Sequence, residues 1–85
     1  MIGEFIILKD DIMNNIKAIE VAIECINQAI LFENNAFFMN TERLNHQGYD
    51  MPMASRGEHE RKLQEYGFSK TMLQDMLDRV EFNLQ

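Results

Sequence analysis

The stretch DIMNNIKAIEVAIECINQAILFENNAFF, residues 11–38, decides the fold because its isoleucines recur at helical spacing. Successive isoleucines from Ile12 to Ile30 are 4, 3, 4, 3 and 4 residues apart, and Phe37 follows Ile30 by seven. This spacing places the side chains at the a and d positions of a seven-residue repeat. It predicts a helix over 11–39 that packs on another helix through Ile12, Ile16, Ile19, Ile23, Ile26, Ile30 and Phe37.

The two ends of this predicted helix differ in character. Asp10 and Asp11 precede the isoleucines, where acidic side chains cap a helix or meet its dipole. At the other end, apolar side chains surround the helix instead of lining one side, and such a helix has to be covered all round. We therefore expect a binding or oligomer interface made by Leu31, Phe32, Phe37, Phe38 and Met39.

Residues 40–55 are predicted to connect this helix to a second helical region over 56–84. Gly48, Asp50 and Pro52 are turn-forming residues. Ser55 and Glu58 match a capping box at the start of the second region. Gly67, followed by Ser69, leaves two alternatives open: one long helix, or two shorter helices that meet at Gly67.

These patterns predict an all-α fold, a long helical hairpin that forms a single domain over 1–85. A chain of 85 residues buries a modest share of its surface, and oligomerisation is one way to compensate. Two helices alone do not cover the apolar end of the first one. We therefore expect a homodimer with a four-helix-bundle-like core, or a tight complex with another protein.

The charge of the chain indicates the chemistry of a partner. The formal net charge is −6, and residues 1–50 carry eight acids against three bases. An acidic surface repels phosphate backbones, which argues against nucleic-acid binding, and it suits a basic protein. Three acids of the first helix are candidates for steering such a partner: Glu20, Glu24 and Glu33.

The single cysteine and the N-terminal segment bear on the compartment. Cys25 excludes an intramolecular disulfide, which fits a reducing environment. The segment MIGEFIILKDD has a short apolar run but neither the basic region of a signal peptide nor the length of a membrane span. We expect a cytoplasmic protein with no membrane segment.

No motif in the chain indicates catalysis, a cofactor or a metal site. Glycine clusters that hold phosphate groups are absent from the sequence. Glu58, His59 and Glu60 are adjacent, so on a helix their side chains diverge by about 100° and do not converge on one ion. We expect a protein that is not an enzyme and that binds no cofactor and no metal.

One segment offers a different function. Residues 62–77, KLQEYGFSKTMLQDML, resemble the second and third helices of helix-turn-helix DNA-binding domains, with Gly67 in the turn. The resemblance implies a transcriptional regulator that dimerises through its first helix. Leu63 departs from the family pattern, since a small residue is usual there, and Asp75 and Asp78 disfavour entry into a DNA groove.

The sequence favours a small acidic protein-protein interaction module. It would be an inhibitor or adaptor that binds a larger protein through an apolar helix face, with the helix-turn-helix regulator as the alternative. A purely structural oligomer is a third hypothesis, because isoleucine at both a and d positions favours more than two strands.

Overall fold

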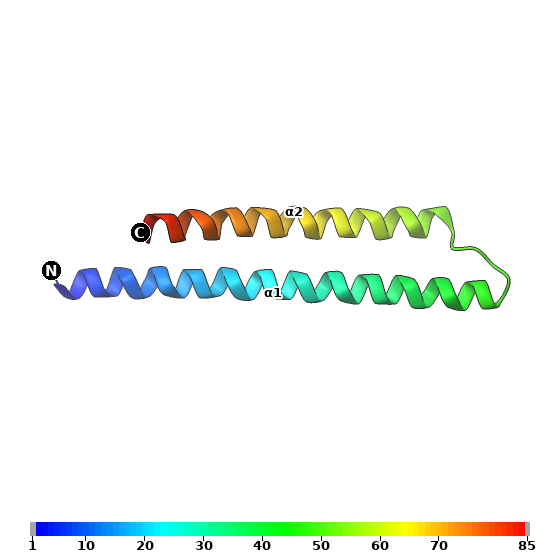
Figure 1. Ribbon diagram of the computed structural model, residues 1–85, viewed down its shortest axis with the longest axis horizontal. Coiled ribbons are helices and arrows are strands. Elements are labelled where there is room, and N and C mark those ends of the chain that lie inside the picture. Colours follow the sequence, from blue (N-terminus) through cyan, green and yellow to red (C-terminus); the bar gives the residue numbers. More distant parts are fainter. Residues whose placement is uncertain (1, 85) are drawn as a thin grey trace.

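A computed structural model describes the backbone of residues 2–84 and the side chains of residues 11–82. Two helices account for nearly all of it: α1, Ile2–His46, and α2, Met53–Leu84. They run antiparallel and lie side by side (Figure 1). No strand forms in the described part of the chain. The predicted all-α helical hairpin is confirmed.

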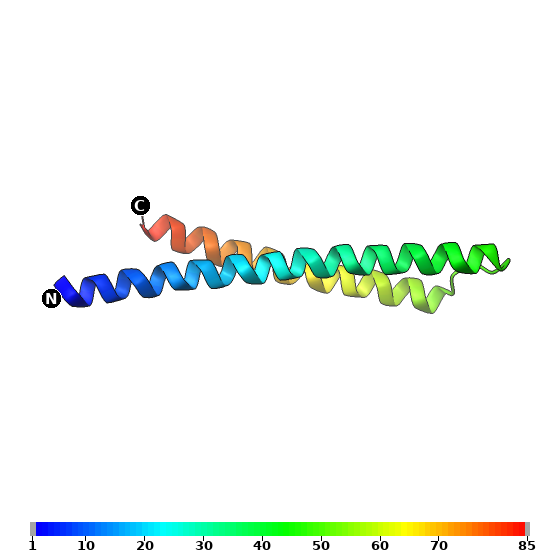
Figure 2. The ribbon, with the colours of Figure 1, turned by 90° about the horizontal axis from the view of Figure 1, so that it is seen from below.

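The hairpin is a rod that measures 70 × 16 × 16 Å. With 45 residues, α1 is longer than α2, which has 32, so the N-terminal part of α1 extends past the end of α2 (Figure 1). The difference of 13 residues corresponds to about 20 Å of helix. Seen from below, α2 crosses α1 at a shallow angle (Figure 2).

The isoleucine stripe faces α2. Its members are half-buried from Ile12 to Ile30, and so is Phe37. The side chains of α2 that oppose them also recur at heptad spacing and are buried or half-buried: Leu63, Tyr66, Leu73, Leu77 and Val80. The helix that covers the isoleucines therefore belongs to the same chain.

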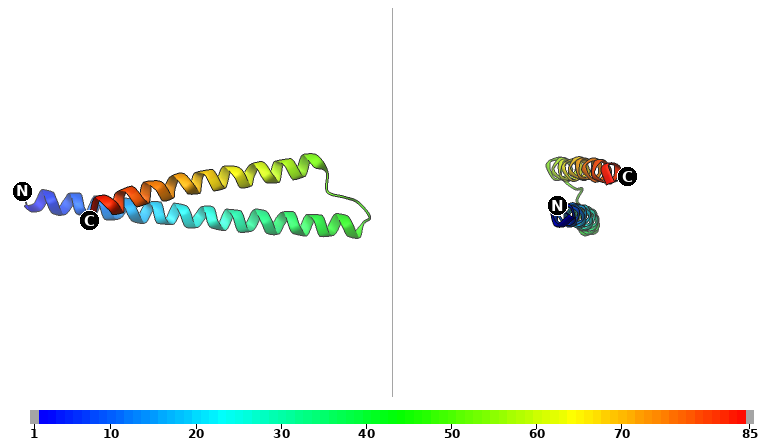
Figure 3. Two further views of the ribbon diagram at one scale, coloured as in Figure 1. Left: turned by 45° about the horizontal axis from the view of Figure 1, so that its top comes forward. Right: turned by 90° about the vertical axis from the view of Figure 1, so that its left-hand side faces the viewer.

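The core of the hairpin is a single seam. Within the described part of the chain, only Met51 and Leu77 are buried, at 8% and 7% exposure. The end-on view explains this, because each helix has one helical neighbour and is open on its other sides (Figure 3). A side chain in such a seam is covered from one direction only.

Helix α1 is longer than the predicted 11–39. It continues to His46, and Asp11 lies inside it instead of at its start. Leu44, seven residues after Phe37, extends the inward-facing stripe by two turns and is half-buried. Thr41 supports the same turns, since its Oγ1 donates a hydrogen bond to the carbonyl oxygen of Phe37 at 2.8 Å. Because the half-buried, inward-facing stripe continues to Leu44, the helix does not end at residue 39.

The connection spans 47–52 instead of the predicted 40–55, and Gly48 makes its turn. Gly48 has a φ of +82°, which only glycine adopts without strain. The amide of Tyr49 donates to the carbonyl of Leu44 at 2.8 Å, and that of Gly48 to the carbonyl of Asn45 at 3.0 Å. This pair of bonds is the Schellman motif that ends many helices. The prediction of a turn at Gly48 is confirmed.

Helix α2 begins earlier than predicted and is continuous. The amide of Arg56 donates to the carbonyl of Pro52 at 3.1 Å, so the first helical hydrogen bond already involves residue 52. Ser55 therefore lies within the first turn, and the predicted capping box at Ser55 does not form. At Gly67 the helix is unbroken, and apart from the neighbouring residues and the backbone of the same helix no atom lies within 4 Å of the position a Cβ would take there. Residues 53–84 form one helix, not two.

Candidate protein-interaction surfaces

Twelve large apolar side chains of the described residues lie on the outside of the hairpin. They occur on both helices and on the connection, and their exposure ranges from 48% for Met76 to 83% for Met53. Apolar surface of this extent is typical of interaction sites. The exposed set is Met13, Val21, Leu31, Phe32, Phe38, Met39, Tyr49, Met53, Phe68, Met72, Met76 and Phe82.

The apolar cluster predicted at the end of the first helix faces three ways: Phe37 faces α2, Leu31 and Phe38 share one open side of α1, and Phe32 and Met39 share another. Phe37 points to α2 and is half-buried, with its ring stacked on that of His59 at a centroid distance of 4.0 Å. Leu31, Phe32, Phe38 and Met39 are exposed. Phe37 therefore belongs to the contact between the helices, and the other four lie on open surface.

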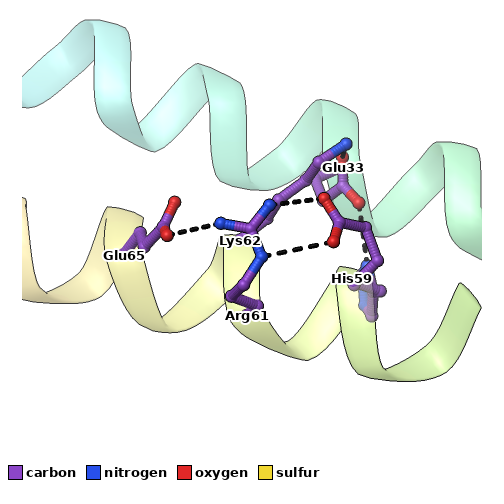
Figure 4. A network of polar contacts seen from close by, with 6 residues as sticks. Glu33, His59, Arg61, Lys62 and Glu65 are labelled. Atoms are coloured by element: carbon purple, nitrogen blue, oxygen red, sulfur yellow. Dashed lines mark hydrogen bonds and ion pairs between the residues drawn. The ribbon is translucent and has the colours of Figure 1, made fainter. Parts of the chain in front are cut away.

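Glu33 also points to α2. Its Oε1 lies 3.1 Å from Nδ1 of His59, and its Oε2 lies 4.0 Å from Nζ of Lys62 (Figure 4). The Glu33 side chain is 20% exposed. Glu33, one of the three acids predicted to steer a partner, is therefore held between the helices by His59 and Lys62, and Phe37 stacks on the His59 ring. Glu20 and Glu24 are exposed.

A second polar network lies on the outer surface of α2. Arg61 donates hydrogen bonds to Glu58 and to Glu65 (Figure 4). The bond from Arg61 lowers the pKa of Glu58, and the charges of Arg61 and Lys62 act in the same direction. The bond and charge of Glu58 raise the pKa of Arg61. All of these groups except Lys62 are exposed, so the network contributes little to stability.

The closed end of the hairpin contains a hollow of about 830 Å³. Residues of both helices and of the connection line it, so it marks one side of the hairpin at that end. From α1 come Glu33, Ala36, Phe37, Asn40, Arg43 and Leu44; from the connection come Tyr49, Asp50, Met51 and Pro52; from α2 come Ala54, Ser55, Glu58, His59 and Lys62.

One open side of α1 combines acids with large apolar groups. Glu24, Leu31 and Phe38 follow one another at seven-residue steps, and Glu20 lies one turn before Glu24. Seven-residue steps remain on one face of a helix. All four are exposed, Phe38 at 64%. We name this set, Glu20, Glu24, Leu31 and Phe38, the acidic flank. Sequence reasoning found its members, and the helix places them together.

Another open side of α1 carries no charge at all over three heptads. Its residues are spaced 4, 3, 4, 3, 4 and 3 apart, which makes a second apolar stripe beside the isoleucines. Phe32 and Met39 are exposed at 75% and 69%. We name it the uncharged stripe: Ala18, Ala22, Cys25, Ala29, Phe32, Ala36 and Met39. Its spacing was readable from the sequence, but the sequence prediction included only Phe32 and Met39.

Two methionines of α2 lie on the same side of the hairpin as the uncharged stripe. The hollow fixes this side, because Ala36 of α1 and Glu58 and Lys62 of α2 line it together. Met72 follows Glu58 by 14 residues and Met76 follows Lys62 by 14, and two heptads return to the same helix face. Both methionines are exposed. We name the uncharged stripe together with Met72 and Met76 the uncharged face.

Other kinds of site are not found among the described residues. No group of three or more His, Cys, Asp or Glu side chains there is arranged to hold a metal ion. Neither helix has, over the residues that were searched, a segment long and apolar enough to cross a membrane. Comparison of the chain with protein-family models, with curated proteins and with solved structures finds no match.

Proposed function

We propose that this chain is a protein-protein interaction module that forms a homodimer and binds a larger, basic protein as an inhibitor or adaptor. The observation that carries the proposal is the amount of apolar side chain left uncovered. Twelve large hydrophobic residues are exposed, whereas two are buried in the hairpin, within the described part of the chain. A folded chain with this ratio gains stability by covering these side chains with another protein surface.

The acidic flank is the surface that we assign to the larger partner. Leu31 and Phe38 supply apolar contact area, and Glu20 and Glu24 supply negative charge on the same side of α1. Aromatic anchors account for much of the binding energy in protein interfaces, and peripheral charges speed the encounter with a partner of opposite sign. The combination fits a partner that presents an apolar pocket with Lys or Arg around it.

The alternative function, a helix-turn-helix regulator, has less support. That motif requires a turn between two helices at Gly67, and α2 passes through Gly67 without a break. The exposed acids Asp75 and Asp78 lie on this same continuous helix.

Affinity capture with matched variants tests the proposed function. Immobilised wild-type chain is incubated with extract of the cells that produce it, beside Phe38→Asp on the acidic flank and Phe68→Asp on α2. Both phenylalanines are exposed, at 64% and 69%, so both variants should remain helical by circular dichroism. We expect a basic protein that wild type and Phe68→Asp retain, that Phe38→Asp loses, and that salt weakens.

Two results would contradict the proposal. Equal retention by wild type and Phe38→Asp would remove the acidic flank from the binding site. Retention of no protein by wild type at low salt would leave the module without a partner, and the function would have to be sought elsewhere.

A further inference from the structure

We infer that the uncharged face is the surface on which a second copy of this chain packs, with α1 antiparallel to α1 of the second copy and the two connections at opposite ends. The inference rests on the homodimer in the proposed function and adds its face and direction. It is independent of the larger partner, because the acidic flank stays outside the contact between the copies.

The exposed area of the hairpin matches what a dimer of this kind buries. The chain exposes 7023 Å². A compact monomer of 10.0 kDa exposes roughly 5,200 Å² by size scaling. The excess is about 1,800 Å² per chain, or about 3,600 Å² for two chains. Obligate homodimers bury about 2,000–5,000 Å² in total.

Charge selects the uncharged face over the acidic flank for self-association. From Ala18 to Met39 the uncharged stripe has no ionisable side chain except the Cys25 thiol, so the contact of α1 with α1 buries no charge, while Glu58 and Lys62 of α2 lie at its edge. On the acidic flank, two copies would bring Glu20 and Glu24 toward the same acids of the other chain. Like charges that face each other oppose association.

The order of small and large side chains selects the antiparallel direction. The first four members of the uncharged stripe, from Ala18 to Ala29, are alanines and a cysteine. The two large members, Phe32 and Met39, are in its second half. An antiparallel pair centred near Ala29 places Phe32 and Met39 of each copy against the small residues of the other. A parallel pair would place Phe32 against Phe32 and leave gaps between the alanines.

The two exposed methionines of α2 fit the same arrangement. The stacking of Phe37 on His59 shows that these two residues lie at the same level along the hairpin. In an antiparallel pair, each residue forward along α2 corresponds to one residue back along α1, so Met76 lies at the level of residue 20 and Met72 at the level of residue 24. Antiparallel pairing centred near Ala29 then brings these methionines to the level of residues 34–38 of the second copy. The hollow of about 830 Å³ opens there, beside Ala36 and Phe37. Methionine suits the filling of such irregular space.

Spin-label distances on the dimer test the direction of the two copies. Asn45, exposed in the last turn of α1, is replaced by cysteine in a Cys25→Ser background and labelled. Two labels that are each 16 residues from Ala29 lie about 48 Å apart in the antiparallel dimer, at 1.5 Å per residue. A parallel dimer would bring them within roughly 20 Å, about two helix diameters. A tenfold excess of unlabelled chain should abolish either distance.

A matched pair of variants tests the face. Phe32→Asp lies on the uncharged stripe, and Phe38→Asp lies on the acidic flank six residues later. Solution mass is measured against concentration by light scattering after size exclusion. We expect a dimer for wild type and Phe38→Asp. For Phe32→Asp we expect the dissociation constant to rise about 100-fold or more, because each dimer contains two of the changed side chains.

The outcomes separate the inference from the proposal on which it rests. A wild-type dimer with labels near 48 Å, weakened by Phe32→Asp alone, supports it. A dimer with labels near 20 Å, or one that Phe38→Asp dissociates and Phe32→Asp does not, overturns the inference and leaves a homodimer. A wild-type chain that stays monomeric at all concentrations overturns the homodimer as well, whereas the capture experiment still judges the larger partner.

Discussion

Replacing Leu77 by alanine tests whether the seam between α1 and α2 holds the hairpin together. Leu77 is 7% exposed and opposes the isoleucines of α1, so alanine removes buried methyl groups and leaves a cavity. In protein cores this change costs about 2–5 kcal/mol, and least where the neighbours can collapse. Here the opposing isoleucines are only half-buried. We therefore expect the free energy of unfolding to fall by about 2–3 kcal/mol, the lower end of that range.

That loss is large for a chain of this size, whose total stability is about 4–13 kcal/mol by length. Urea unfolding followed by circular dichroism measures it, at one fixed protein concentration because association stabilises the folded state. Phe68→Ala is the control: the side chain is larger but 69% exposed, so the change should stay within about 0.5 kcal/mol. A loss below about 1 kcal/mol for Leu77→Ala, or one equal to that of Phe68→Ala, would refute the seam as the source of stability.

Two further changes test the turn and the surface charges. Gly48→Ala should lower the free energy of unfolding by about 1–2 kcal/mol because the φ of Gly48 is +82°. Gly67→Ala should raise it by up to about 1 kcal/mol, because Gly67 lies inside α2 with open space around it. Urea unfolding measures both changes, and effects of the same sign would contradict a turn at Gly48 and a continuous helix at Gly67. Arg61→Gln should raise the pKa of Glu58 toward 4.5, as nuclear magnetic resonance titration would show. Because that pKa is lowered in the folded chain, the Glu58 contribution to stability is present above about pH 4.5 and is lost as the pH falls through the lowered value. An unchanged Glu58 pKa in the variant would show that Arg61 is not the cause.

Much of the fold was predictable because the signals are local. The isoleucine spacing predicted the first helix and its packing face, and Gly48 predicted the turn. The helix ends were predicted less well. Capping signals at Asp11 and Ser55 suggested shorter helices, but α1 and α2 continue past both residues. At the end of α1, Leu44 shows the reason: its half-buried position in the inward-facing stripe outweighs the weak preference of the intervening residues for a connection.

The candidate sites were predictable in composition but not in direction. The cluster from Leu31 to Met39 was recognised as apolar on every side, and the structure divides it among three faces. Phe37 follows Ile30 by one heptad, so its inward direction was implied by the stripe itself. Glu33 also lies at a d position, yet only the presence of His59 and Lys62 on α2 explains why a carboxylate is tolerated there.

The sequence by itself determined that the chain is helical on both sides of a turn, because helical periodicity depends on residues three and four positions apart, and it left open whether Gly67 divides the second helical region. Only the tertiary structure decided which face of α1 its own chain covers and which faces stay open. That outcome depends on the register between α1 and α2, set by side chains more than 20 residues apart such as Glu33 and His59. The register covers the isoleucines and leaves the other faces of α1 open to another protein. Local sequence patterns do not encode it, because it depends on residues far apart in the chain.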